Sequence, residues 1–239
     1  GKNGDGKSTL LHLFKGTQEP DSGRVTIRGG LTFGMLDQRD PLDDNATVRE
    51  VALEGREDYE WAAETKSREI VEALLGGISL EAKIGSLSGG QRRRADLARL
   101  LLKDWDILAL DEPTNHLDID SVTWLEEFLK SYTGAVLIIS HDRYFLDKIV
   151  TKTIEIENKK SHVYEGNYSF YAKNKEINLQ IEQHHYIQQQ REIKRQEEVI
   201  AKLKSFNREK SIKRAESRQK QLDKIVPVDK PENLPEKMR

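Results

Sequence analysis

Short apolar runs alternate with amphipathic stretches along the first two thirds of the chain. Apolar runs at 107–110 and 135–139 and a more apolar stretch at 31–36 predict strands. Alternation of Val25 and Ile27 with polar neighbours predicts a half-buried strand over 24–28. Apolar residues at helical spacing predict helices over about 7–15, 47–76, 88–102 and 121–131. Strands that alternate with helices indicate an α/β fold, with a mostly parallel sheet flanked by helices.

The pattern changes after two last short strands, predicted at 153–157 and 162–164. Residues 169–206 contain no glycine or proline and are rich in Lys, Glu, Gln and Ile, so they predict a long helix. A break near 205–208 separates it from a second helix, about 212–225, which prolines at 227, 231 and 235 terminate. We therefore expect three parts: a globular domain (1–165), an α-helical hairpin arm (166–226) and an extended linker (227–239).

Composition and charge set these parts in context. The chain has no cysteine, which excludes disulfides and thiolate metal sites and fits a cytoplasmic protein. Its apolar runs are too short to cross a bilayer, so no membrane insertion is expected. Residues 171–239 hold 17 Lys and Arg against 11 Asp and Glu, while the whole chain has a formal net charge of −2. A basic tail on an acidic body indicates a polyanionic partner for the tail.

The first nine residues fit the P-loop pattern G-x-x-x-x-G-K-[ST], with Gly1, Gly6, Lys7 and Ser8 in the fixed positions. In such a loop, backbone N–H groups surround the phosphates of ATP, Lys7 reaches the β- and γ-phosphates, and Ser8 offers its hydroxyl to Mg²⁺. A glycine-rich turn before an ordinary helix is the alternative, which the four matches disfavour. The predicted nucleotide-binding residues are Gly1, Asn3, Gly4, Gly6, Lys7, Ser8, Thr9 and, from a later loop, Gln38. A P-loop normally follows a buried strand, so we expect the chain to be a fragment that begins inside this motif.

Three further polar sites each follow an apolar strand. Asp111 is expected to hold Mg²⁺, and Glu112 is expected to be the catalytic base that polarises the attacking water. His141 is expected to be the second catalytic group, which contacts the γ-phosphate, and Gln38 to sense Mg²⁺ and that water. An Asp-Glu pair or a single His at a strand end is usually only solvated, but a complete P-loop upstream favours the functional interpretation.

A second anion-binding element occurs at Leu87, Ser88, Gly89, Gly90 and Gln91. A serine and two glycines at the start of a helix form a concavity of N–H groups, yet this domain already has one phosphate-binding loop. Two such elements make sense if the second binds a nucleotide held by another domain.

Several motifs, taken in chain order, resemble those of an ATP-binding cassette (ABC) ATPase over residues 1–165. The P-loop, Gln38, residues 87–91, Asp111-Glu112 and His141 correspond to its Walker A, Q-loop, signature, Walker B and H-loop. The resemblance implies that two cassettes close head-to-tail, each placing its signature on the ATP of the other. It also implies that residues 115–118, with Asp118, form the D-loop at that interface. Low ATPase activity is then expected for this chain alone.

The stretches 111–118, 140–147 and 164–169 resemble the ABC-F family. That resemblance implies a second cassette in the same full-length chain, and the ribosome, through tRNA or rRNA, as partner of the arm. The residues expected to contact RNA are Arg208, Lys210, Lys213, Arg214 and Arg218.

Other interpretations remain open at this point. The alternative to an RNA-binding arm is a solvated coiled-coil surface with ordinary charge pairs. One alternative to an ABC-F protein is the nucleotide-binding subunit of an ABC transporter, which usually lacks such an arm. The other is a DNA-associated ABC ATPase, in which the coiled coil typically interrupts the cassette.

Overall fold

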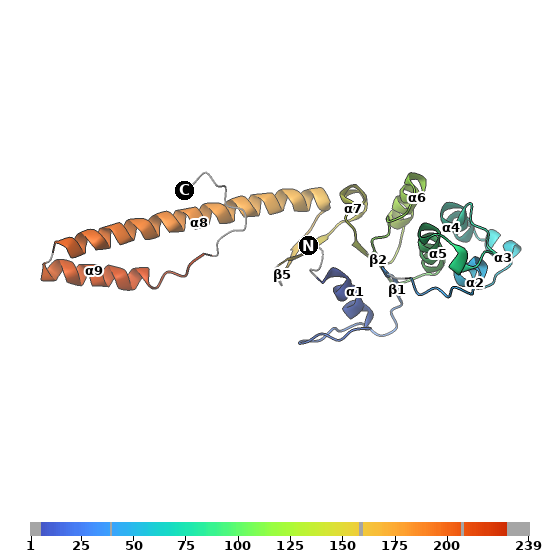
Figure 1. Cartoon of the computed structure of the whole chain (residues 1–239), viewed down its shortest axis with the longest axis horizontal. Coiled ribbons are helices and arrows are strands. Elements are labelled where there is room, and N and C mark those ends of the chain that lie inside the picture. The colour runs from blue at the N-terminus through green and yellow to red at the C-terminus, as the bar shows by residue number, and fades with distance from the viewer. Residues whose placement is uncertain (1–5, 39, 158–159, 207, 229–239) are drawn as a thin grey trace. The chain divides into compact units, whose positions relative to one another are not determined.

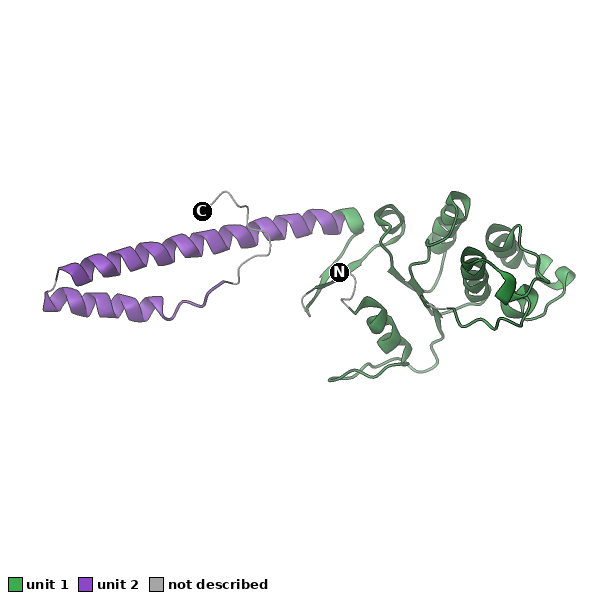
Figure 2. Ribbon diagram, viewed as in Figure 1, with its two compact units in different colours: residues 1–169 green, residues 170–239 purple. Residues whose placement is uncertain are grey.

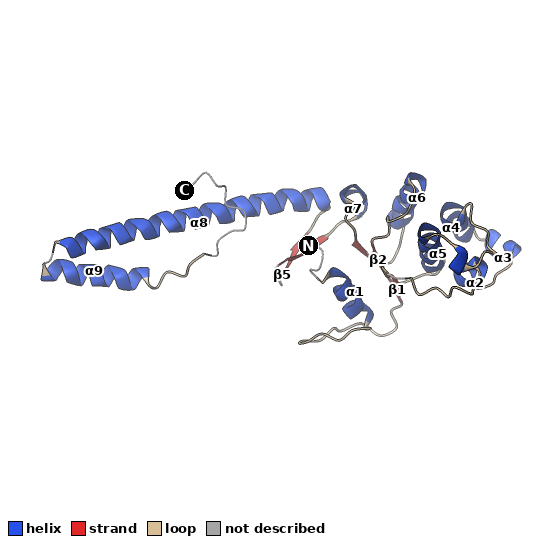
Figure 3. Ribbon diagram, in the orientation of Figure 1, coloured by secondary structure: helices blue, strands red, loops and turns tan. Residues whose placement is uncertain are grey.

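Three of the predicted strands form a parallel sheet in the computed structural model, which describes residues 6–38, 40–157, 160–206 and 208–228. The strands are β1 (Phe33–Leu36), β2 (Ile107–Asp111) and β3 (Ala135–Ile139), in the order β1-β2-β3. Strands are red in Figure 3, where β1 and β2 are labelled. Leu36 pairs with Leu110, and Leu110 pairs with Ile138. All three strands therefore end at the same edge of the sheet, and the predicted α/β class is confirmed.

Helices cover the sheet because its side chains alternate between two apolar clusters. Leu108 and Leu110 belong to the larger cluster, which includes residues of α4 (Thr65–Leu75), α5 (Gly89–Leu101) and α6 (Ile119–Lys130). Met35 and Ala109 pack in a separate cluster with Leu11 of α1 (Lys7–Lys15). The helix α1, which follows the P-loop, thus packs on strand residues that are not part of the larger cluster.

The region 47–76, predicted as one helical stretch, contains three helices. They are α2 (Val48–Leu53), α3 (Asp58–Ala62) and α4. The chain turns after α2 because Glu54 and Gly55 both have positive φ angles, 54° and 75°. A capping box begins α2: the Thr47 hydroxyl accepts a hydrogen bond from the Glu50 N–H, and the Glu50 carboxylate accepts one from the Thr47 N–H.

The helix α7 (Arg143–Ile149) was not predicted from the sequence. Asp142 caps it, since its carboxylate accepts hydrogen bonds from the N–H groups of Tyr144 and Phe145. Phe145 is fully buried. An aspartate three residues before a buried aromatic residue is the local signal that reveals this helix.

The predicted strand over 24–28 is absent, and this prediction was wrong. These residues lie in irregular structure, with Val25 39% and Ile27 46% exposed. Alternating residues form a strand only when a neighbouring strand supplies hydrogen bonds and a surface to pack on, and no described strand pairs with this segment.

The predicted pair of short strands is present as β4 (Thr153–Glu157) and β5 (Lys160–Tyr164), which pair antiparallel. The chain consists of two compact units, residues 1–169 and 170–239 (Figure 2).

In the second unit, most of α8 (Tyr168–Ser205) and all of α9 (Glu209–Leu222) form a helical hairpin (Figure 1). The helix α9 begins three residues earlier than predicted. Among the described residues of the hairpin, Ile200 of α8 and Ala215 of α9 are the buried apolar ones. The Arg218 guanidinium of α9 donates to the Gln196 side-chain oxygen of α8 at 2.8 Å. Few apolar residues thus hold the two helices together.

Candidate nucleotide-binding site

The carboxyl edge of the sheet brings together three of the predicted sites. Gln38 lies two residues beyond β1, Asp111 and Glu112 stand at the end of β2, and His141 lies two residues beyond β3. Parallel register places these strand ends side by side, which the sequence pattern alone only implied.

Ser8 and Asp111 are in direct contact across 103 positions of sequence. The Ser8 hydroxyl donates a hydrogen bond to Asp111 Oδ2 at 2.6 Å. Asp111 is fully buried, and its other oxygen, Oδ1, accepts no hydrogen bond from any described residue. Burying a carboxylate oxygen without a partner costs folding free energy unless a cation or a hydrogen-bond donor binds it.

The P-loop itself is described only in part. Gly6 has a φ angle of 80°, a conformation that favours glycine, and it precedes the first turn of α1. Lys7 and Ser8 are half-buried and Thr9 is exposed. Gly1, Asn3 and Gly4 lie outside the described residues, so their predicted phosphate contacts stay predictions.

Glu112 has a strained backbone and two contacts with the end of β3. Its φ angle is 51°, unusual for a non-glycine residue, and its N–H donates to the Ile139 carbonyl at 2.8 Å. Its carboxylate accepts a hydrogen bond from the His141 N–H at 3.3 Å, and the imidazole Nε2 lies 3.6 Å from Glu112 Oε1. Glu112 is 14% exposed and His141 62%, so the carboxylate is sheltered while the imidazole faces outward.

A cleft of about 290 Å³ opens beside Glu112. It is lined by Gln38, Asp40, Gly89, Arg93, Glu112, Asn115 and His116. The structure therefore places the predicted water-sensing glutamine, the predicted base and the first residue of α5 around one space. Asp37, which precedes Gln38, contacts α1 through His12, whose Nε2 lies 3.1 Å from Asp37 Oδ2.

The signature residues, 87–91, lie at the start of α5, with Gly89, Gly90 and Gln91 in its first turn. Ser88 caps the helix: its hydroxyl accepts from the Gln91 N–H at 3.3 Å, and the Gln91 side chain accepts from the Ser88 N–H at 3.0 Å. Leu87 is half-buried, whereas Ser88 and Gly89 are exposed. A Cβ on Gly90 would lie 3.4 Å from His116 Cβ, so this glycine packs closely against the residues before α6. The capping box orders the turn, and its binding of a second nucleotide stays a prediction.

Asp118 has a structural role that the sequence interpretation missed. Its carboxylate accepts a hydrogen bond from the Ser121 N–H at 2.8 Å and so caps α6. This bond holds the pKa of the Asp118 carboxyl below its usual value. Its predicted role at an interface between cassettes stays a prediction.

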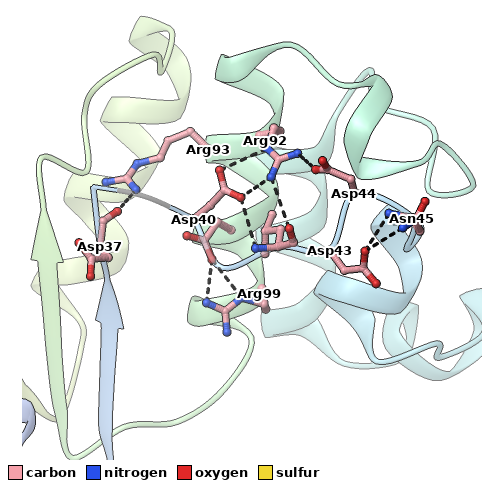
Figure 4. Close-up of polar contacts among 10 residues, drawn as sticks. Asp37, Asp40, Asp43, Asp44, Asn45, Arg92, Arg93 and Arg99 are labelled. Atoms are coloured by element: carbon pink, nitrogen blue, oxygen red, sulfur yellow. Dashed lines mark hydrogen bonds and ion pairs between the residues drawn. The ribbon is translucent and has the colours of Figure 1, made fainter. Parts of the chain in front are cut away.

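Two adjacent arginines of α5 bind the segment that contains Gln38 (Figure 4). The Arg92 guanidinium binds Asp40 at 2.6 Å, which holds the pKa of the Asp40 carboxyl below its usual value, and also binds Asp44. Arg93 donates to the main-chain carbonyls of Asp37 and Asp111. Neither residue was singled out from the sequence. The only signal was the run of three arginines directly after Gln91.

The oxygen atoms of Ser8 and Asp111 suit a magnesium ion whose remaining ligands come from a bound nucleotide and water. Among the residues that the structure describes, no group of three His, Cys, Asp or Glu side chains is placed to hold a metal ion alone. Mg²⁺ typically binds one or two carboxylates and the substrate phosphates, and keeps several waters. The buried Asp111 with its unpartnered oxygen, joined to the Ser8 hydroxyl, matches that donor set.

The arm presents basic side chains with different local partners. Lys213 pairs with Glu209 at 3.0 Å within α9, and Arg218 binds Gln196 of α8. Arg208, Lys210 and Arg214 are exposed and form no ion pair with any residue that the structure describes. Phe206, near the bend, is 57% exposed.

A P-loop motif, an Asp-Glu pair at a strand end and a capped Ser-Gly-Gly turn at the start of α5, together with an α/β sheet, form the pattern expected of a nucleotide-binding cassette. Two family models, both described as ABC transporter, match the chain, one over residues 1–115 and the other over residues 154–239. The chain therefore belongs to the ABC family, and its relatives support the resemblance to the ABC-F branch.

Similar proteins cover most of this chain. YdiF of Bacillus subtilis is 36% identical over 283 residues, covering 97% of this chain and 42% of YdiF. The energy-dependent translational throttle protein EttA of Haemophilus influenzae is 38% identical over 221 residues, covering 77% of this chain and 40% of EttA. The archaeal ribosome recycling factor aABCE1, solved with the ribosomal stalk protein aP1, aligns with a TM-score of 0.58 at 26% identity, over 68% of this chain and 32% of that one. The chain thus spans well under half the length of these proteins.

Within the described part of the chain, no helix is long and apolar enough to span a membrane.

Proposed function

We propose that this chain is the ATP-binding and ATP-hydrolysing cassette, with its arm, of a cytoplasmic ABC-F protein that acts on the ribosome. The observation that supports it best is the pairing of Ser8 with Asp111 beside the contact between Glu112 and His141. A Mg²⁺ ion held by Ser8 and Asp111 neutralises charge on the phosphates of ATP. Glu112 polarises the attacking water, and His141 and Gln38 orient it.

The signature turn is proposed to act on a nucleotide held by a second cassette. Ser88 and Gly89 are exposed at the start of α5, where backbone N–H groups and the helix dipole favour an anion. Asp118 is proposed to lie at the same interface. Because each composite site needs both halves, this chain alone should bind ATP weakly and hydrolyse it slowly.

The arm is proposed to contact tRNA or rRNA through Arg208, Lys210, Lys213, Arg214 and Arg218. Exposed cations on a helical hairpin suit phosphate contacts, and three of these five have neither a side-chain hydrogen bond nor an ion pair among the described residues. The names of the matched relatives, a translational throttle protein and a ribosome recycling factor, favour this function over transport or DNA association.

The test is co-sedimentation with ribosomes of the protein with both proposed cassettes, carrying Glu112→Gln. With ATP the variant should stay on the ribosome, because hydrolysis no longer releases it. With ADP, or with Lys7→Ala added, it should remain in the supernatant. Equal partition with ATP and ADP would contradict a ribosome cycle driven by ATP, and ATP-dependent recovery with DNA or membranes instead would favour the other candidate functions.

A further inference from the structure

Arg93 is a buried arginine whose described hydrogen bonds go to main-chain carbonyls. The side chain lies on the second turn of α5, and the residue is 8% exposed. One terminal nitrogen, Nη1, donates to the carbonyl of Asp37 and the other, Nη2, donates to the carbonyl of Asp111. Figure 4 shows the guanidinium extended from α5 to Asp37 at the end of β1.

Each of these two carbonyls belongs to the peptide that joins a strand end to a predicted site residue. Asp37 precedes Gln38, and Asp111 precedes Glu112. A peptide unit is planar, so holding its carbonyl oxygen also fixes the direction of the N–H and Cα of the next residue. Arg93 therefore constrains the orientation of the peptide units that precede Gln38 and Glu112.

The constraint on Glu112 is needed because its conformation is unfavourable. A non-glycine residue with a φ angle of 51° persists only where its surroundings hold it in place. On one side, the Glu112 N–H donates to Ile139. On the other side, the preceding carbonyl accepts from Arg93. The two bonds hold the same peptide unit between β3 and α5.

The residue type suits this task. A guanidinium is a rigid planar fork with several donors, so one side chain can bind two carbonyls on different strands. A lysine ammonium is a compact charge on a flexible stem and does not fix two acceptors in one geometry. A glutamine amide is neutral and shorter, and its two donors diverge from a single nitrogen.

The neighbouring residue attaches more of the same segment to α5. Arg92 binds Asp40 at 2.6 Å and also contacts Asp44, so two consecutive arginines hold Asp37, Asp40 and Asp44. Gln38, Glu112, Arg93 and Gly89 all line the cleft of about 290 Å³. A displacement of α5 would therefore move the backbone that carries Gln38 relative to Glu112.

We propose that Arg93 is a positioning residue for ATP hydrolysis: it sets the separation of Gln38 and Glu112 and links it to the signature turn at the start of α5. It acts through these two residues and does not itself touch the nucleotide. The inference rests on the proposed ATPase function and is independent of the arm and the ribosome.

The experiment measures steady-state and single-turnover ATP hydrolysis by the protein with both proposed cassettes, carrying Arg93→Lys or Arg93→Gln. Rates are expressed per site that binds a non-hydrolysable ATP analogue, so that unfolded molecules do not count. We expect kcat to fall by about 10- to 100-fold, the scale of a misplacement of about 1 Å in a catalytic group. KM for ATP should change by less than about threefold, since only the transition state loses its alignment.

Two controls separate positioning from general stability. Arg68 also donates to a main-chain carbonyl, that of Ala62, but it is exposed in α4 and away from the site, so Arg68→Lys should leave kcat unchanged. In a Glu112→Gln background, Arg93→Lys should cause at most about a twofold further loss, because groups that act as a unit are not additive.

An unchanged kcat in Arg93→Lys and Arg93→Gln would overturn the inference. So would a further fall in kcat of about 10- to 100-fold when Arg93→Lys is added to Glu112→Gln. Parallel loss of ATP binding and kcat would also overturn it, since that indicates a structural role alone. A wild-type protein without ATPase activity would instead refute the proposed function, and this inference with it.

Discussion

Ser8 and Asp111 are joined by a hydrogen bond of 2.6 Å between a P-loop hydroxyl and a buried carboxylate. The bond connects the start of α1 to the end of β2 and leaves the other Asp111 oxygen without a partner among the described residues. The two residues come from motifs that the sequence placed in one site, and the structure brings their side chains into contact.

Replacing the buried carboxylate tests its role toward Mg²⁺. Asp111→Asn should weaken Mg²⁺-dependent ATP binding by about tenfold or more, the scale of one lost contact to a charged group, roughly 1.5–3 kcal/mol. Without Mg²⁺, in EDTA, the variant and the wild type should bind ATP alike. Titration calorimetry with and without Mg²⁺ makes the comparison, and equal Mg²⁺ dependence of the two proteins would contradict the assignment.

Glu112→Gln should preserve ATP binding and lower hydrolysis by about 100-fold or more, because the amide cannot accept a proton from water. The substitution keeps the size of the side chain, so folding should be unaffected. Phosphate release by the protein with both proposed cassettes measures the effect. Hydrolysis at the wild-type rate would show that Glu112 is not the base.

Charge reversal tests the arm. Arg208, Lys210 and Arg214 changed to Glu should weaken ribosome co-sedimentation, and the salt dependence of binding should fall by up to about one slope unit per residue removed. Basal ATPase activity should be unchanged, since these residues lie in the second unit.

The matched control for this experiment reverses Arg191, Lys194 and Lys202, three exposed cations of α8. It makes the same change in net charge on the other helix of the arm. Equal weakening in both sets would indicate general electrostatic attraction and no contact specific to the bend and α9.

A pH effect is expected at the other end of the sheet. The N–H and hydroxyl of Thr32 both donate to Asp106, at 2.7 and 2.8 Å, which lowers the pKa of the Asp106 carboxyl below its usual value. A carboxyl whose pKa is lowered by folding adds stability above its unfolded pKa, and this stability is lost as the pH falls below about 4.

Asp106→Asn should therefore make the free energy of unfolding less dependent on pH between about pH 5 and pH 3. Urea denaturation at several pH values measures this dependence. A pH dependence that Asp106→Asn does not alter would contradict the prediction.

Much of the fold could be predicted because its signals are local. The apolar runs at 107–110 and 135–139 form strands, and the residues just beyond them carry the candidate chemistry. The segment 24–28 failed because alternation specifies only which face is apolar, and the strand itself requires a partner. The helix α7 was missed because it is short and its main signal is a single cap, Asp142.

The sequence by itself therefore determined the class of fold, the order of the motifs and the residue types at each strand end, since these depend on near neighbours. Only the tertiary structure decided which of these residues touch. Arg93 binds carbonyls 56 and 18 positions away, and its role depends on where two strand ends lie relative to one helix. A main-chain carbonyl carries no sequence signature, so no pattern of residues could have predicted that Arg93 binds there.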